Sequence, residues 1–210
     1  MFADPTLPNH VIYQPKTPSN LKIPVVVWGN GQCFGDGTIF QAFLGQIASY
    51  GVFVIAGGKL GKGAPDGTTI NAQNLKDGID WAVKNAGTGN YTHVDASRLA
   101  IWGQSCGGFL ALQLASDSRV KSVGIFNSGT TMIGGSTNIV ATLRKPIFYF
   151  IGGACDMAYP AVSHPTVDQC SLEMSLTKTT LGRGRLQGHR SGESLLERKP
   201  PSRTSGDLPR

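Results

Sequence analysis

The residues with the clearest chemical potential are Gly103-Gln104-Ser105-Cys106-Gly107, which fit the pattern Gly-x-Ser-x-Gly. One apolar run leads into them from Leu99, and a second continues from them to Ser116. This arrangement is typical of a strand that turns sharply into a helix and presents a serine hydroxyl at the tip, where only small neighbours fit. Such a serine can attack an acyl carbon, and the amide of Cys106 at the helix start can bind the developing oxyanion. The alternative is a glycine-rich turn whose serine has no chemical role.

The segments that must position this turn alternate between strand and helix patterns. Continuous apolar runs are typical of buried parallel strands, and they occur at residues 23–29, 52–58, 98–103, 120–129 and 145–153. Amphipathic helices are expected at 38–50 and 69–86, and an apolar helix follows the serine. In the second helix, Leu75 and Ile79 face inward with either Ala82 or Val83. The alternation predicts an α/β fold, a mainly parallel sheet with helices on both faces, and an edge strand near 12–16.

Composition excludes several classes of protein. Half of the net charge of +6 comes from the last 50 residues, and no basic stripe alternates with aromatic residues, so nucleic-acid binding is not expected. No apolar run reaches the ~20 residues of a membrane span. The four cysteines form no Cys-x-x-Cys pair, which argues against a zinc site. The segment from Gly29 to Phe34 matches only part of the dinucleotide-binding pattern, because Phe34 stands where the third glycine belongs. We therefore expect neither a metal nor a cofactor.

The stretch from Gly29 to Gly58, GNGQCFGDGTIFQAFLGQIASYGVFVIAGG, together with the Gly-x-Ser-x-Gly turn, resembles the α/β-hydrolase superfamily. It looks like the branch of dienelactone-hydrolase-like enzymes, cutinase-type polyester hydrolases and platelet-activating-factor acetylhydrolases. In that branch an oxyanion loop, a helix and an Ala-Ser-His-Gly-like turn follow the strand, and Ala48-Ser49-Tyr50-Gly51 stands at the place of the turn. The resemblance covers about residues 9–160. It implies an α/β-hydrolase fold, a small-molecule or polymer ester as substrate, and no cofactor.

The resemblance also implies roles for individual residues. It assigns the second oxyanion donor to the loop after the first buried strand, at the backbone N–H of Gln32 or a neighbouring residue. Cys33 follows that loop and Cys106 follows the serine, and these two loops meet in this fold. A disulfide between them is therefore allowed if the protein is exported, and two buried free thiols are the other reading.

The acid and the base of a catalytic triad should follow the serine along the chain. Asp156 comes directly after the run at 145–153 and is favoured over Asp168, although a loop or helix-capping aspartate is the alternative. The acid would orient a histidine and stabilise its cation. His189, in a Gly-His context, is the remaining candidate base, with a solvated tail histidine as the alternative. The other histidines either precede the serine or follow Asp156 too closely for a helix and a strand between them, namely His10, His93 and His164.

Residues 161–210 differ in composition from residues 1–160. All aromatic residues lie before position 161, and all glutamates lie after it. This basic segment has neither strand nor helix periodicity and is expected to be a disordered tail. The hydrolase domain, residues 1–160, would then lack its last strand and helix.

The sequence thus predicts a serine hydrolase that cleaves a carboxylic ester through an acyl-enzyme on Ser105. One alternative is a catalytically inactive, truncated or frame-shifted hydrolase homologue that lacks the triad histidine. The other is a binding module that uses the pocket at the Ser105 turn without chemistry. The N-terminal residues show no signal-peptide pattern, although the resembled branch is often secreted, so localisation stays open. The oligomeric state is open as well.

Overall fold

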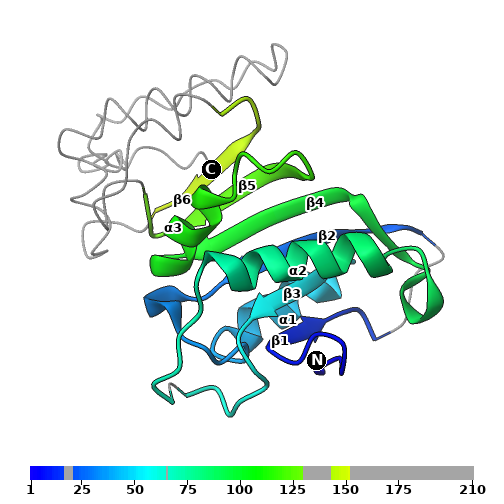
Figure 1. Cartoon of the computed structure of the whole chain (residues 1–210), viewed down its shortest axis with the longest axis horizontal. Helices are drawn as coiled ribbons and strands as arrows, with labels where there is room; N and C mark the ends of the chain where they lie inside the picture. Colours follow the sequence, from blue (N-terminus) through cyan, green and yellow to red (C-terminus); the bar gives the residue numbers. More distant parts are fainter. Residues whose placement is uncertain (17–20, 65, 130–142, 152–210) are drawn as a thin grey trace, which may run out of the picture.

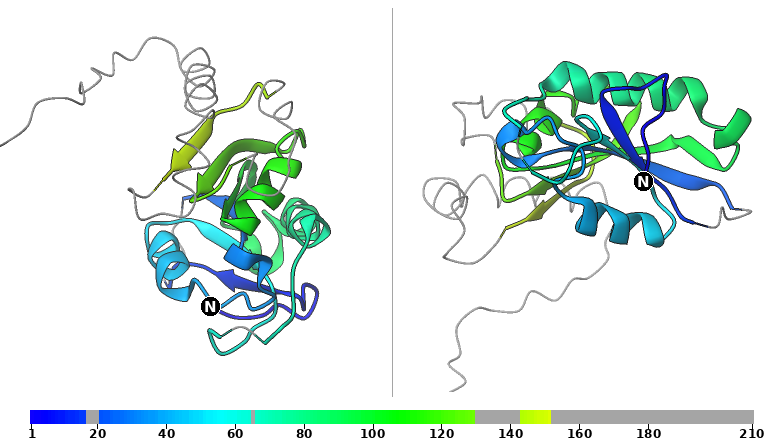
Figure 2. Two further views of the ribbon diagram at one scale, coloured as in Figure 1. Left: turned by 90° about the vertical axis from the view of Figure 1, so that its left-hand side faces the viewer. Right: turned by 90° about the horizontal axis from the view of Figure 1, so that it is seen from below.

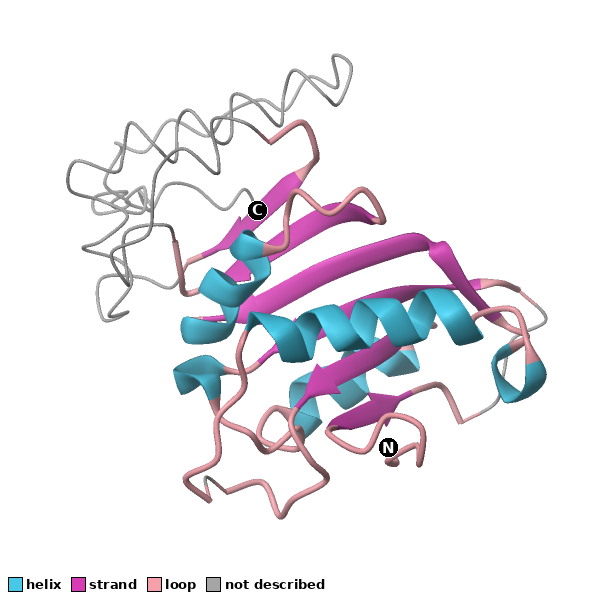
Figure 3. Cartoon of the chain, viewed as in Figure 1, coloured by secondary structure: helices cyan, strands magenta, loops and turns pink. Residues whose placement is uncertain are grey.

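The computed structural model describes residues 1–16, 21–64, 66–129 and 143–151. In these residues, helices flank a twisted sheet of six strands (Figures 1 and 3). The strands are β1 (His10–Tyr13), β2 (Ile23–Gly29), β3 (Phe53–Gly57), β4 (Val94–Gln104), β5 (Val120–Phe126) and β6 (Ile147–Phe150). The helices are α1 (Gln41–Ser49), α2 (Ala72–Asn85) and α3 (Cys106–Gln113), with short 3₁₀ helices η1 (Gly31–Cys33) and η2 (Gly89–Tyr91).

The sheet has the strand order β1-β3-β2-β4-β5-β6. Among the six described strands, β1 at the edge runs antiparallel to its neighbour, and the other pairs are parallel. Strand β2 lies between β3 and β4, with Val27 opposite both Ile55 and Ile101. The chain therefore leaves β2 toward one side of the sheet and returns to add β4 on the other side. The carboxyl ends of β2 and β4 meet where this order reverses, which is where open α/β sheets usually bind ligands.

The helices cover both faces of the sheet, as predicted. Figure 2 shows α1 on one face, with α2 and α3 on the other. A hydrophobic core lies on each face of the sheet, and alternate residues of β2 point into each of them. Val25 and Val27 pack on the α2 side, and Val26 and Trp28 pack on the α1 side. Burial of both faces explains why this strand is one continuous apolar run rather than an alternating one. The predicted α/β class with a mainly parallel sheet is confirmed.

The structure corrects the predicted limits of some elements. Strand β4 begins at Val94, four residues before the predicted start, because Val94 and Asp95 pair with Ile23 and Pro24 of β2 although the apolar run begins later. In α2 the inward residue is Ala82, while Val83 is 45% exposed. No described helix is long and apolar enough to cross a membrane. The predicted loss of a last strand and helix, and the predicted tail at 161–210, fall outside the described residues.

His10 on β1 is a buried titratable group, only 2% exposed. Its Nε2 donates to the carbonyl of Asn74 at 2.7 Å, and its Nδ1 has no partner among the described residues. Burial lowers the pKa of His10 below its ordinary 6.5, although the Asn74 carbonyl and the charge of Asp77 act in the opposite direction. The folded chain therefore holds a neutral imidazole at pH values where the unfolded chain is already protonated.

We expect the free energy of unfolding to fall as the pH drops from 7.5 to 5.5, with His10 responsible for part of the fall. The unfolded state binds the proton near pH 6.5, whereas the folded state does so only at lower pH. Urea unfolding at both pH values, for the wild type and His10→Gln, measures this share. The glutamine amide can still donate to Asn74 but does not titrate. An equal pH dependence in both proteins would contradict the prediction.

Candidate functional site

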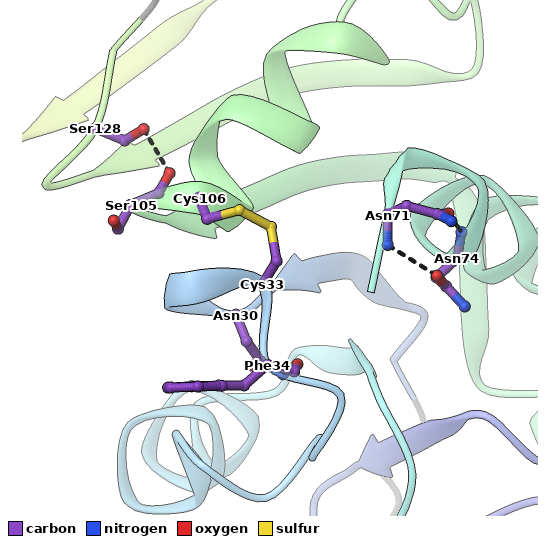
Figure 4. The surroundings of a disulfide bond; sticks show 8 residues. All are labelled: Asn30, Cys33, Phe34, Asn71, Asn74, Ser105, Cys106 and Ser128. Carbon is purple, nitrogen blue, oxygen red and sulfur yellow. Dashed lines mark hydrogen bonds between the residues drawn. A yellow bond between two sulfur atoms is a disulfide. The ribbon is translucent and has the colours of Figure 1, made fainter. Parts of the chain in front are cut away.

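Ser105 forms the turn between β4 and α3. Its backbone has φ 51° and ψ −119°, a conformation that non-glycine residues rarely adopt and that costs energy. The Ser105 N–H donates to the carbonyl of Phe126 at 2.9 Å, and the Ser105 carbonyl accepts from the N–H of Gly108 at 2.9 Å. The hydroxyl of Ser128 also donates to that carbonyl, at 2.6 Å. These bonds hold the turn through its backbone, and the Ser105 hydroxyl points away from Ser128 (Figure 4).

The glycines around Ser105 allow three backbone segments to touch. A Cβ on Gly107 would lie 2.0 Å from the carbonyl oxygen of Gly29, and a Cβ on Gly103 would lie 2.2 Å from that of Gly107. Real side chains do not approach backbone oxygens so closely. Positions 103 and 107 therefore require glycine, because the backbone of α3 contacts the ends of β2 and β4 there. This is the steric reason for the Gly-x-Ser-x-Gly pattern here.

The loop after β2 reaches the start of α3. Gln32 and Cys33 both have left-handed backbones, with φ 50° and 54°. Cys33 forms a disulfide with Cys106, and their Cα atoms lie 5.3 Å apart (Figure 4). The pairing that the sequence left open is therefore present. The structure brings the segment that contains Gln32 next to Cys106 and Ser105, three of the five residues predicted for the site.

Asn30 organises the same loop, a role that the sequence analysis missed. Its side chain is fully buried, and its amide nitrogen donates to the carbonyls of Phe34, Asp36 and Gly57 at 2.9, 3.0 and 2.8 Å. Its Oδ1 accepts from Nε1 of Trp28 at 3.0 Å. The side chain thus ties the loop to the end of β3. The available signal was a polar residue directly after the most apolar strand, where a buried amide must find partners.

Asp36 fixes a second loop beside the first. Its carboxylate accepts from the N–H and hydroxyl of Thr38, at 2.7 and 2.5 Å, and from the N–H of Gly63 at 2.9 Å. Burial raises the pKa of Asp36, but the hydrogen bonds from Thr38 and Gly63 together outweigh it and lower the pKa below the ordinary value. The group therefore stays ionised as a structural acceptor, and it is a poor candidate for donating a proton.

The predicted acid Asp156 and base His189 lie outside the described residues, as do Asp168 and His164. Their roles stay predictions. Of the two described histidines, His10 is engaged with α2, as shown above. His93 directly precedes the eleven-residue strand β4, and Ser105 follows that strand, so the two lie at opposite ends of it. This position agrees with excluding His93 as the base.

The described residues contain no cluster of histidine, cysteine, aspartate or glutamate that could hold a metal ion. A cavity of about 660 Å³ lies at the amino-terminal ends of the strands, where Lys22, Val94 and Lys121 are among its walls. Of the candidate residues that the structure describes, none borders it. Arg119 beside it is already paired with Asp80 and Asp117, at 2.6 and 2.5 Å. We therefore place the candidate site at the opposite, carboxyl edge.

No model of a known protein family matches the chain, and no curated protein matches its sequence. The functional assignment therefore depends on the geometry around Ser105.

Proposed function

We propose that this chain is a serine hydrolase of the α/β-hydrolase fold, which cleaves a carboxylic ester through an acyl-enzyme on Ser105. The strand-turn-helix around Ser105 supports the fold assignment, because a strained turn at the carboxyl end of a parallel strand is the setting of the nucleophile in that fold. The position of the turn beside the end of β2, where the strand order reverses, also favours a ligand site there.

The observation that supports the proposal most directly is the left-handed backbone conformation of Ser105. Its φ of 51° costs a serine about 1–3 kcal/mol, whereas glycine adopts this conformation freely. A turn with a purely structural role would be more stable with glycine. A serine that keeps this strain presents its hydroxyl at the edge of the sheet, which favours a chemical role over an inert turn.

In the proposed reaction, Oγ of Ser105 attacks the carbonyl carbon of the ester and loses its proton to a base. The negative charge that develops on the carbonyl oxygen is held by the backbone N–H groups of Cys106 and Gln32. Collapse of the tetrahedral intermediate expels the alcohol, which takes up the proton, and water then hydrolyses the acyl-enzyme by the same steps. His189 is the proposed base and Asp156 its partner, both on sequence grounds alone.

A fluorophosphonate that reacts with activated serines tests the proposal directly. We expect labelling of the wild type on the peptide that contains Ser105, and complete loss of labelling and of nitrophenyl-ester hydrolysis in Ser105→Ala. Ser49→Ala is the matched control, because Ser49 is exposed on α1 and its hydroxyl donates to the carbonyl of Gln46, in its own helix, at 2.7 Å. Absence of labelling in folded wild-type protein would favour the inactive homologue instead.

A further inference from the structure

We propose that the Cys33–Cys106 disulfide is a positioning element of the oxyanion site, which holds the amides of Gln32 and Cys106 at a fixed separation. The inference rests on the proposed hydrolase function. It assigns the two cysteines a role in the rate of the chemical step, in addition to any role in stability.

Three alternate residues of the loop contact the Ser105 turn. The backbone of Gly29 approaches Gly107 so closely that a Cβ on Gly29 would lie 2.8 Å from the Gly107 carbonyl oxygen. A Cβ on Gly31 would lie 1.9 Å from Oε1 of Gln104. Cys33 is bonded to Cys106. The loop therefore lies along the turn at every second residue, and Gln32 is placed between the second and third of these contacts.

The third contact, between Cys33 and Cys106, depends on a covalent bond. Gln32 and Cys33 both hold positive φ angles, which their side chains disfavour, so neither keeps this conformation by its own preference. The carbonyl of Cys33 accepts from the N–H of Ile70 at 2.7 Å. That hydrogen bond ties the end of the loop to the segment before α2, not to α3. Without the disulfide, the far end of the loop can follow Ile70 away from Cys106.

The disulfide joins one predicted donor, Cys106, to Cys33, the residue next to the other predicted donor. Cys106 is itself one donor and is the first residue of α3, where the backbone N–H has no partner within the helix. Cys33 directly follows the other donor, Gln32. A change in the Cys33–Cys106 separation therefore moves one amide relative to the other. Both amides bind a charge that exists only in the transition state, so the expected effect is on kcat, with KM unchanged.

The double variant Cys33→Ala/Cys106→Ala tests this role, because it keeps both backbone amides and leaves no single unpaired thiol at the site. We expect kcat for a nitrophenyl ester, and the rate of fluorophosphonate labelling, to fall by roughly 10²-fold with KM unchanged. Reduction of the wild type by dithiothreitol, which transfers two electrons to the disulfide and becomes a cyclic disulfide, should have the same effect. Reoxidation should restore only the wild type, and dithiothreitol should not affect the double variant.

Val94→Ala is the control for a general loss of stability, since Val94 is a buried residue at the opposite end of β4. It should keep the wild-type labelling rate when all proteins are folded by circular dichroism. An equal loss in Val94→Ala, a raised KM with unchanged kcat, or full activity of the double variant would each overturn the positioning role. Failure of the oxidised wild type to label would instead refute the hydrolase function, so the two failures are distinguishable.

Discussion

Replacement of Gly107 by alanine is expected to lower the free energy of unfolding by more than about 4 kcal/mol. The added Cβ would lie 2.0 Å from the carbonyl oxygen of Gly29, 2.1 Å from its carbonyl carbon and 2.7 Å from the nitrogen of Asn30. These are backbone atoms at the end of the central strand β2, so no side-chain rotation relieves the overlap. Either α3 or the loop after β2 must shift, and both are joined by the disulfide.

The sign of this effect is opposite to the usual one. Glycine to alanine within a helix normally stabilises by about 1 kcal/mol, because alanine loses less backbone entropy on folding. Gly45→Ala on α1 is the matched control, since its Cβ would meet no atom within 4 Å. Urea unfolding followed by tryptophan fluorescence should show Gly45→Ala slightly more stable than wild type and Gly107→Ala far less stable. Equal stability of the two variants would mean that β2 and α3 are not in backbone contact.

Much of the fold could be predicted from the sequence, because each strand or helix is indicated by the pattern of apolar residues within its own segment. The run at 23–29 became β2 with the predicted limits, since burial of both faces leaves no polar residue within the strand. The amino-terminal part of β4, residues 94–97, was not predicted because Asp95 and Ser97 interrupt the apolar run there. It belongs to the strand because Val94 and Asp95 pair with Ile23 and Pro24 of β2. The choice between Ala82 and Val83 also needed the structure, because one residue corresponds to only 100° of rotation about the helix axis.

In the candidate site, only those features could be predicted whose residues all lie together in one short segment of the sequence. The turn at Ser105 is such a segment, with its glycines and serine adjacent in sequence. The Cys33–Cys106 bond joins residues 73 positions apart, and the sequence alone could not separate it from two buried thiols. The position of Asn30 after an apolar strand indicated only that its amide needs partners. Its acceptors could not be identified from the sequence, because one of them, Gly57, belongs to another strand. The acid Asp156 and base His189 remain predictions from chain order.

Asn30→Asp is expected to cost at least about 3 kcal/mol, although the two side chains have nearly the same shape. The amide of Asn30 donates to three carbonyls at 2.8–3.0 Å, those of Phe34, Asp36 and Gly57. A carboxylate cannot donate, so it would leave these carbonyls without their donor and add a buried negative charge facing three oxygens. The deficit should be smaller at pH 5 than at pH 8, because a protonated carboxyl group regains one donor.

Asn74→Asp makes the same chemical change at a site that needs only an acceptor. Asn74 lies in the first turn of α2, and its Oδ1 accepts from the backbone N–H of Asn71 at 2.9 Å (Figure 4). An aspartate keeps that bond and adds negative charge at a helix N-terminus, which is worth about 0.3–1 kcal/mol. Urea unfolding should therefore show Asn74→Asp at or slightly above wild-type stability. Comparable stability of Asn30→Asp would mean that the loop after β2 does not depend on the three donated hydrogen bonds, and the amide of Gln32 would then have to be held by the disulfide and the glycine contacts alone.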